Sequence, residues 1–254
     1  MFEIFQFPYN DDNYGVLLHS PETNLTAAID AGDADAYIAC AEANGLKIDQ
    51  IWLTHHHGDH TAGTAAMKAR YGCLVLGAAA TQAKVGQIDT VLADGDSFEF
   101  AGAIVHVIHT PGHTLDMLNF YLADPQLVFT GDTLFALGCG RLFEGNASQM
   151  WQSLQKLMVL PPNTTVYCSH EYTLANAKFA LSVEPANTML QSRVIDIEAL
   201  RAEGQPTVPT NLQIELDTNP FLRPHSPEIR ERLEMTDATD AEVFAKIRAL
   251  KDSF

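Results

Sequence analysis

The chain has 254 residues, of which 46% are hydrophobic, so it can bury a substantial core as one large domain or as a domain with an appendage. Its 15 basic and 32 acidic residues give a net charge of −17, which disfavours large contacts with nucleic acid or anionic membranes. The sequence contains no apolar run of membrane-spanning length and no signal-peptide pattern at its start, so we expect a cytoplasmic protein.

The cysteines and the charge balance narrow the kind of site to expect. Cys40, Cys73, Cys139 and Cys168 stand far apart with no CxxC pair, which predicts free thiols rather than disulfides or a thiolate zinc site. Because cations are few, an anionic substrate must meet a local basic patch. We expect a monomer that acts on a small molecule, with neither a nucleic-acid nor a membrane partner.

The first half of the chain begins with strand patterns and then alternates strands and helices. Short apolar runs separated by turn residues predict three antiparallel strands, at residues 2–7, 14–18 and 25–29. A helical period starts at Asp33 and stops at Asn44-Gly45, a typical C-terminal cap. The next elements expected are a strand, a helix and a strand, at residues 48–53, 62–71 and 73–77. This order predicts an α/β layer that binds ligands at the carboxyl ends of its strands.

The middle of the chain predicts more strands. Asp94-Gly95-Asp96 gives a hairpin-like turn within residues 91–100. Later strands are expected at residues 103–108, 118–122, 127–130 and 165–168. The glycine-rich segment 134–146 predicts a loop, after which Ser148 is a suitable N-cap for a helix.

The last third of the chain predicts helices without further strands. Apolar residues at helical spacing predict helices at residues 174–182, 187–203 and 240–251, the last with a capping box at its start. Residues 204–220 between them predict extended or loop structure. We therefore expect a strand-rich domain over residues 1–172 and a helical domain over residues 173–254.

Four histidines and an aspartate crowd into the sequence THHHGDH, directly after a predicted strand. Side chains of an extended segment alternate, so His55 and His57 point to one side and can chelate one ion, while His56 points to the other. Asp59 and His60 fall where the chain turns into a helix and can face a second ion. So many polar groups at one sheet edge need a ligand to offset desolvation and repulsion. Histidine suits zinc or iron, and added carboxylate oxygen also suits manganese.

Three further side chains lie directly after predicted strands, namely His113, Asp132 and His170. Asp132 is singled out as the strand-end acid that neither proline nor another acid follows, and a carboxylate can bridge two ions. With the first four donors they make seven protein ligands, too many for one tetrahedral ion and about right for two. The remaining histidines have no partner at ligand spacing and are assigned structural roles: His19, His56, His106, His109 and His225.

The histidine motif does not stand alone. Together with TPGHT at residues 110–114, GDTLF at 131–135 and SHEYT at 169–173, it resembles the metallo-β-lactamase fold superfamily. More narrowly, the chain resembles glyoxalase II, the hydroxyacylglutathione hydrolases. That resemblance rests on GCGRLFEG at 138–145, on NPFLR at 219–223 and on the tail at 248–254, and it runs essentially end to end.

The resemblance implies an αββα sandwich followed by a helical substrate-binding domain. It assigns one divalent ion to His55, His57 and His113, and the other to Asp59, His60 and His170, with Asp132 bridging the two. The ions implied are zinc first, with iron or manganese also accepted by these ligands. Asp59 and Asp132 are then catalytic, because they hold a metal-bound hydroxide.

Two divalent ions that share a carboxylate lower the pKa of a bridging water enough to give hydroxide near neutral pH. That hydroxide attacks a metal-polarised carbonyl, and the ions stabilise the oxyanion. A thiolate leaving group needs no strong general acid, because the pKa of its thiol is about 8.5. The reaction implied is hydrolysis of S-(2-hydroxyacyl)glutathione, S-D-lactoylglutathione in particular, to a 2-hydroxy acid (D-lactate) and glutathione, in methylglyoxal detoxification.

Glutathione carries two carboxylates, and matching to the family supplies cations for them. These are Arg141 in the glycine-rich loop, and Arg248 with Lys251, i and i+3 neighbours on one predicted helix. Tyr172 and Phe143 match substrate-contacting positions, but some members carry tyrosine where this chain has Phe143, so that hydroxyl contact is absent. Residues 115–118 also depart from the usual glycine-containing sequence, which concerns the local backbone rather than His113.

Two alternatives remain open on the sequence. A mononuclear iron persulfide dioxygenase of the same fold would have an incomplete second metal site, whereas this chain offers Asp59, His60 and His170 together. A non-catalytic metal-binding module would tolerate a closed, water-free coordination shell.

Overall fold

The structure is a computed structural model that describes residues 1–254, and its contacts divide the chain into two compact units. The first unit comprises Met1–His109 and Leu115–Gly131, and the second comprises Thr110–Thr114 and Asp132–Phe254. The predicted domain boundary near residue 172 is a different division and stays a prediction. None of the helices combines the length and the apolar character that crossing a membrane requires.

The first unit is built from strands and short helices. Its strands are β1 (Glu3–Tyr9), β2 (Asn13–Ser20), β3 (Leu25–Ile29), β4 (Gln50–Trp52), β5 (Leu74–Ala78), β6 (Thr90–Leu92), β7 (Ser97–Phe100), β8 (Ala103–His109), β9 (Leu118–Leu122) and β10 (Leu127–Gly131). Its helices are α1 (Ala34–Ala43), α2 (Gly58–Thr61), α3 (Thr64–Tyr71) and α4 (Ala79–Val85).

The sheet formed by β1 to β6 brings two strand ends to one edge. Strands β1, β2 and β3 are antiparallel, as predicted, whereas β3, β4, β5 and β6 run parallel. Ile29 at the end of β3 pairs with Trp52 at the end of β4. The residues that follow these two strands therefore begin side by side, as the rule for parallel α/β sheets predicts.

Side chains of β4 point to both faces of the first sheet, one covered by helices and the other by the second sheet. Ile51 belongs to an apolar cluster with Tyr37 of α1 and Met67 of α3, so these helices cover one face of the sheet. The next residue, Trp52, points to the opposite face because side chains alternate along a strand. Its ring lies 5.1 Å from that of Phe98 in β7 and 5.6 Å from that of Phe120 in β9, between centroids. An apolar core thus joins the two sheets of this unit.

The turn Asp94-Gly95-Asp96 does not close a hairpin, so that prediction is wrong. Strand β6 pairs with β5 in the first sheet, whereas β7 pairs antiparallel with β8 in the second. The turn instead carries the chain from one sheet to the other. Turn residues specify a local bend, but the partner of each strand is decided by which apolar face it buries.

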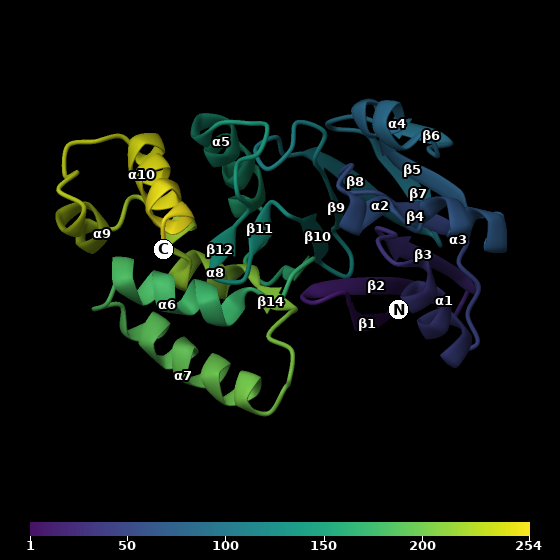
Figure 1. The fold of residues 1–254 in the computed structure, drawn as a ribbon, viewed down its shortest axis with the longest axis horizontal. Coiled ribbons are helices and arrows are strands. Elements are labelled where there is room, and N and C mark those ends of the chain that lie inside the picture. Colours follow the sequence, from purple (N-terminus) through teal and green to yellow (C-terminus); the bar gives the residue numbers. More distant parts are fainter. The chain divides into compact units, whose positions relative to one another are not determined.

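The second unit is mainly helical. Its helices are α5 (Ala147–Met158), α6 (Thr173–Val183), α7 (Thr188–Ala202), α8 (Leu212–Thr218), η1 (Pro220–Leu222), α9 (Pro227–Arg232) and α10 (Asp240–Asp252). Its strands are β11 (Leu134–Phe135), β12 (Gly138–Cys139), β13 (Thr165–Cys168) and β14 (Thr210–Asn211). Helices α6 and α7 lie side by side (Figure 1) and bury an apolar cluster that contains Ala177, Val194 and Ile197.

Two helix predictions for this unit are wrong, and a short strand, β14, pairs with β13 in the last third of the chain, where no strand was predicted. Helix α5 is capped by Asn146 rather than Ser148: the Asn146 side chain accepts from the Gln149 backbone, and the Gln149 side chain accepts from the Asn146 backbone, each at 3.0 Å. A helix, α8, occupies Leu212–Thr218 where a loop was predicted. This helix has only seven residues, too few for apolar periodicity to stand out, and its fully buried Glu215 is held by hydrogen bonds from the Leu137 backbone and from Arg193.

The four cysteines are free, as predicted. Burial raises the pKa of Cys139 to about 11 and that of Cys168 to about 12. Neither side chain is therefore a thiolate at neutral pH, and neither is suited to act as a nucleophile.

We expect Asn146→Ala to lower the free energy of unfolding by about 1 kcal/mol, because the Gln149 backbone N–H at the start of α5 loses its side-chain acceptor. Ser148→Ala serves as the control and should change it by less than about 0.5 kcal/mol. Denaturant unfolding of both variants measures the difference, and a larger loss for Ser148→Ala would contradict this capping assignment.

Candidate active site

The first donor set consists of His55, His57, Asp59 and His60, all in the first unit. His55 and His57 follow β4, and their ring nitrogens Nε2 and Nδ1 lie 3.0 Å apart. Asp59 and His60 lie in the single turn of α2, where Asp59 Oδ2 is 3.3 Å from His60 Nε2. His55 and His60 are fully buried. The sheet edge therefore concentrates three imidazoles and a carboxylate, as strand alternation and the following helix predict.

Asp30 fixes the orientation of this set. It directly follows β3, has a positive φ of 62° and is 2% exposed. Its Oδ1 accepts from the backbone N–H of Thr54 at 2.7 Å, and its Oδ2 accepts from Thr54 Oγ1 at 2.9 Å and lies 2.8 Å from His60 Nδ1. One buried carboxylate therefore joins the end of β4 to helix α2.

These bonds also determine which histidine nitrogens carry protons. The Thr54 hydroxyl donates to Asp30, so at 3.0 Å it can only accept from His55 Nδ1–H. His60 Nδ1–H likewise donates to Asp30. The Nε2 atoms of His55 and His60 are then the unprotonated nitrogens, the form that a metal ligand requires.

Asp30 is a functional residue that was not predicted from the sequence. The statement that Asp132 is the single strand-end acid followed by neither proline nor another acid is wrong, because Asp30 follows Ile29 and precedes Ala31. The available signal was a carboxylate directly after the predicted strand that neighbours the histidine strand. Its role emerges only from the parallel pairing of β3 with β4.

Asp59 is positioned through its backbone as well as its side chain. Tyr9 Oη donates to the Asp59 carbonyl at 2.8 Å, and Asn13 Nδ2 donates to Asp59 Oδ2 at 3.1 Å. A Cβ added to Gly32 would lie 1.8 Å from the Asp59 carbonyl oxygen. The close backbone approach of the two loops therefore requires glycine at position 32.

His56 points away from its two neighbours, as alternation predicts, but it does have a partner. Its Nδ1 lies 2.9 Å from Asp116 Oδ1, and Thr81 Oγ1 donates to Asp116 Oδ2 at 2.6 Å. Asp116 is 2% exposed and belongs to the segment 115–118 that departs from the family pattern. This departure thus supplies a buried carboxylate that holds the middle histidine of the motif.

The second donor set consists of His113, Asp132 and His170, all in the second unit. The two oxygens of Asp132 face different imidazoles: Oδ2 lies 3.3 Å from His113 Nε2, and Oδ1 lies 3.3 Å from His170 Nε2. His113 Nδ1–H donates to the Arg141 carbonyl at 2.8 Å, which leaves its Nε2 unprotonated. A Cβ at Gly140 would lie 2.0 Å from the Asp132 carbonyl oxygen, so glycine is required beside this set.

The spacing of both sets fits a divalent metal. Donor atoms on one tetrahedral zinc ion at ordinary bond lengths lie about 3.3–3.6 Å from one another. Three donor pairs are separated by 3.3 Å, namely Asp59–His60, His113–Asp132 and His170–Asp132. Clusters of histidine and aspartate such as these can hold a metal ion. The donor chemistry therefore agrees with a divalent metal site, and it does not distinguish zinc from iron or manganese.

The predicted substrate residues gather around the second donor set. The Tyr172 ring stacks on the His170 ring with centroids 4.8 Å apart, and the Phe143 ring lies 5.2 Å from that of His113. Phe143 is 62% exposed and Tyr172 is 36% exposed, so both can meet a ligand. Arg141 is also exposed, with its Nε 3.6 Å from Asp252 Oδ1.

Arg248 and Lys251 differ in accessibility although both lie on α10. Arg248 is 5% exposed, donates to the Cys139 carbonyl at 2.9 Å and pairs with Asp252 at 2.9 Å. Lys251 donates to the Ala175 carbonyl at 3.2 Å from a half-buried position. Burial and the charge of Arg248 lower the pKa of Lys251. Of the two, only Lys251 is accessible for direct contact with a ligand.

The glycine-rich segment is not an open loop, because β11 and β12 form a small hairpin within it. Asn219 holds this hairpin, donating from Nδ2 to the carbonyls of Phe135 and Gly138 at 3.2 and 3.0 Å. The buried Glu215 accepts from the backbone N–H of Leu137 at 2.9 Å. Asn219 of the Asn219-Pro220 motif therefore stabilises the hairpin that follows Asp132.

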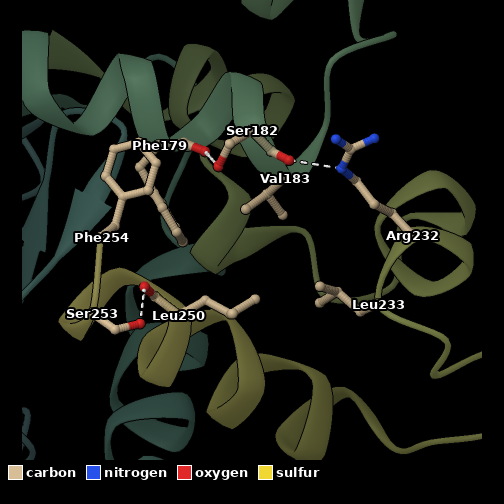
Figure 2. Close-up of a pocket in the computed structure, with 8 residues that line it drawn as sticks. All are labelled: Phe179, Ser182, Val183, Arg232, Leu233, Leu250, Ser253 and Phe254. Carbon is tan, nitrogen blue, oxygen red and sulfur yellow. Dashed lines mark hydrogen bonds between the residues drawn. The ribbon is translucent and has the colours of Figure 1, made fainter.

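Two of the cavities in the second unit differ in character. One of about 350 Å³ has mainly apolar walls, including Phe179, Leu250 and Phe254, with Arg232 at its edge (Figure 2). The other, of about 510 Å³, includes Lys251 in its lining. No predicted substrate residue lines the first cavity, so the second is the one that relates to the predicted site.

Comparison with known proteins places this architecture in a class. Residues 25–170 match the family model described as the metallo-beta-lactamase superfamily. Among solved structures, ETHE1 from Myxococcus xanthus superposes with a TM-score of 0.65 at 24% identity, covering 100% of this chain and 99% of that chain. The BLEG-1 B3 metallo-beta-lactamase also gives 0.65, at 22% identity over 87% of this chain and 100% of its own. The fold is thus the metallo-β-lactamase fold, as predicted.

Three further comparisons identify the family within this superfamily. Residues 171–254 match the model described as hydroxyacylglutathione hydrolase C-terminus. The hydroxyacylglutathione hydrolase of Brucella anthropi is 52% identical over 99% of this chain and 97% of its own length. That of Methylococcus capsulatus is 50% identical over 100% and 99%. The chain belongs to the hydroxyacylglutathione hydrolase family.

We expect Asp30→Asn to weaken zinc binding by about 10- to 100-fold, because the amide cannot replace the carboxylate that orients His60 and, through Thr54, His55. Asparagine tolerates the positive φ of this position, so backbone strain is not added. Competition with a chromogenic chelator measures the affinity. Asp35→Asn, on the exposed first turn of α1, is the matched control, and equal zinc affinity in all three proteins would contradict the role of Asp30.

Proposed function

We propose that this protein hydrolyses S-(2-hydroxyacyl)glutathione thioesters, S-D-lactoylglutathione in particular, to a 2-hydroxy acid and glutathione. The observation that carries the proposal is its end-to-end identity of 50–52% with proteins named hydroxyacylglutathione hydrolase. Such a protein would serve in methylglyoxal detoxification, and we propose that it does so as a cytoplasmic monomer. No membrane or nucleic-acid partner forms part of the proposal.

Within this proposal the two donor sets serve one centre of two divalent ions, zinc in the first place. His55, His57 and His113 would hold one ion, Asp59, His60 and His170 the other, and Asp132 would bridge them. Asp132 Oδ2 faces His113, and Asp132 Oδ1 faces His170. This arrangement supports the bridging role, because the two histidines are assigned to different ions. When bound, the ions would acidify water and polarise the thioester carbonyl.

The remaining steps belong to the protein's own side chains. Asp30 and the Arg141 carbonyl hold the protons of His60 and His113 on Nδ1, so that neither ring changes tautomer during turnover. Asp59 and Asp132 are the catalytic carboxylates of the proposal, since they place negative charge beside the reacting water. The glutathione thiolate leaves without a dedicated acid, because the pKa of its thiol, about 8.5, is close to ambient pH.

The glutathione group would contact the exposed side chains around the second donor set. We propose that the rings of Tyr172 and Phe143 pack against it and that Arg141 and Lys251 attract its carboxylates. Arg248 is also part of the proposed site. Because it is buried, it would add positive charge near Lys251 rather than contact the ligand. A metal domain over residues 1–172 and a glutathione-binding domain over residues 173–254 fit the two family models, which meet between residues 170 and 171.

The alternative of a mononuclear iron persulfide dioxygenase is less well supported. It does not account for the close pairing of Asp59 with His60, nor for the second imidazole on Asp132. A non-catalytic metal module is also less well supported, because the exposed aromatic side chains beside His113 and His170 provide a surface for a substrate.

We expect metal-dependent hydrolysis of S-D-lactoylglutathione, followed by the loss of thioester absorbance, with about two ions per chain by elemental analysis. Chelation should abolish the activity, and added zinc should restore it. Asp132→Asn should lower kcat by at least about 100-fold because both ions lose a ligand. Asp237→Asn, at an exposed loop position, is the control.

Two outcomes would reject the proposed function. One is the absence of metal-dependent hydrolysis in protein that carries two ions. The other is oxygen uptake with glutathione persulfide by protein that carries one iron, which would support the dioxygenase instead.

A further inference from the structure

The cavity of about 510 Å³ in the second unit is formed by three helices and the chain end. Leu174, Ala175 and Lys178 contribute from one face of α6, at the i, i+1 and i+4 spacing of a shared helix surface. Arg201 contributes from the last turn of α7, and Lys251 from the last turn of α10. Glu171 and Phe254 complete the lining.

This lining is basic, in contrast to the rest of the chain. Three of its side chains are cations, Lys178, Arg201 and Lys251, and one is an acid, Glu171. The whole chain has 15 basic and 32 acidic residues. A net positive cavity in a protein of charge −17 is a local anion-binding environment, because the field near a concave surface is set by its nearest charges.

Two of the three cations already have partners within the protein. Arg201 donates to the Gln205 carbonyl at 2.7 Å and lies 3.5 Å from Glu171 Oε2. Lys251 donates to the Ala175 carbonyl, and its Nζ lies 5.3 Å from the Phe179 ring centroid. Burial lowers the pKa of Lys251 because it disfavours the charged form, and a bound anion would stabilise that charged form.

Lys178 differs from the other two cations. It is exposed, on the face of α6 that lines the cavity, and forms no ion pair with a side chain of the protein. Its ammonium group is therefore available to a ligand without the loss of an existing interaction. A long flexible side chain at the edge of a cavity can reach one carboxylate of a ligand whose other carboxylate contacts Lys251.

We infer that Lys178 is a further specificity-determining residue, which with Lys251 binds the two carboxylates of the glutathione group. This inference rests on the proposed function for the identity of the anion. Two carboxylates on one ligand match two separated ammonium groups in one cavity, with Arg201 adding charge behind them. The dicarboxylate, rather than the acyl group, is what this cavity selects.

The apolar cavity beside it is less suited to the same ligand. Its one cation, Arg232, already donates from Nε to the Ser182 carbonyl at 2.7 Å, as Figure 2 shows. The other lining side chains there include Val183, Leu233 and Leu250. One cation at the edge of apolar walls cannot neutralise two carboxylates.

The test is the binding of S-methylglutathione, which cannot be hydrolysed, to the metal-loaded protein by calorimetry. We expect Lys178→Ala to weaken binding by about three- to tenfold and Lys178→Arg to restore most of it. The dimethyl ester of S-methylglutathione, without carboxylates, should bind both proteins equally. With S-D-lactoylglutathione, Lys178→Ala should raise KM by a similar factor and leave kcat within about twofold, because the lost interaction is equal in ground and transition states.

Lys246→Ala, an exposed lysine on α10 outside the cavity, is the matched control and should bind like the wild type. Unchanged binding by Lys178→Ala, or an equal loss for the diester, would overturn the inference. So would weakening by Arg232→Ala in place of Lys178→Ala, since the anion would then lie in the other cavity. If Lys178→Ala weakens S-methylglutathione binding while no thioester is hydrolysed, the anion site stands and the proposed function fails.

Discussion

The buried carboxylate of Asp30 is the interaction on which the first donor set depends. A carboxylate that is 2% exposed is stable only if its oxygens are hydrogen bonded, and here Thr54 and His60 supply those bonds. Because Asp30 directly follows β3 and Thr54 follows β4, the parallel pairing of these strands brings the two residues together. The desolvation that makes Asp30 costly to bury also makes its bonds strong, so the histidines have little freedom to reorient.

In the second unit, both backbone and side chains hold the second donor set in position. Asp132 lies between His113 and His170, and Gly140 permits the chain to pass close behind it. The β11–β12 hairpin that carries Gly140 is held in turn by Asn219 and Glu215, from helices much later in the chain. The helical part of the unit thus supports the metal-ligand geometry as well as offering a basic cavity.

Much of the fold and of the donor chemistry could be predicted from the sequence. The strands and helices around THHHGDH followed from apolar periodicity and caps, since these are local properties. Predictions failed where the decision was not local: β6 and β7 joined different sheets, and α8 formed around the buried Glu215. Asn146 in place of Ser148 as the cap of α5 was a choice between two suitable residues that only the backbone geometry settles.

The sequence by itself determined the residue types at the strand ends, the scarcity of cations and the family to which the chain belongs. Only the tertiary structure decided that Asp30 orients His60, that Arg248 is buried whereas Lys251 is accessible, and that Lys178 shares a cavity with Lys251. The reason is physical. The type of donor atom is a property of each residue alone, whereas the burial of a side chain and its hydrogen-bond partners depend on which distant segments pack together. Residues 73 positions apart on two helices have no common local signal until those helices meet.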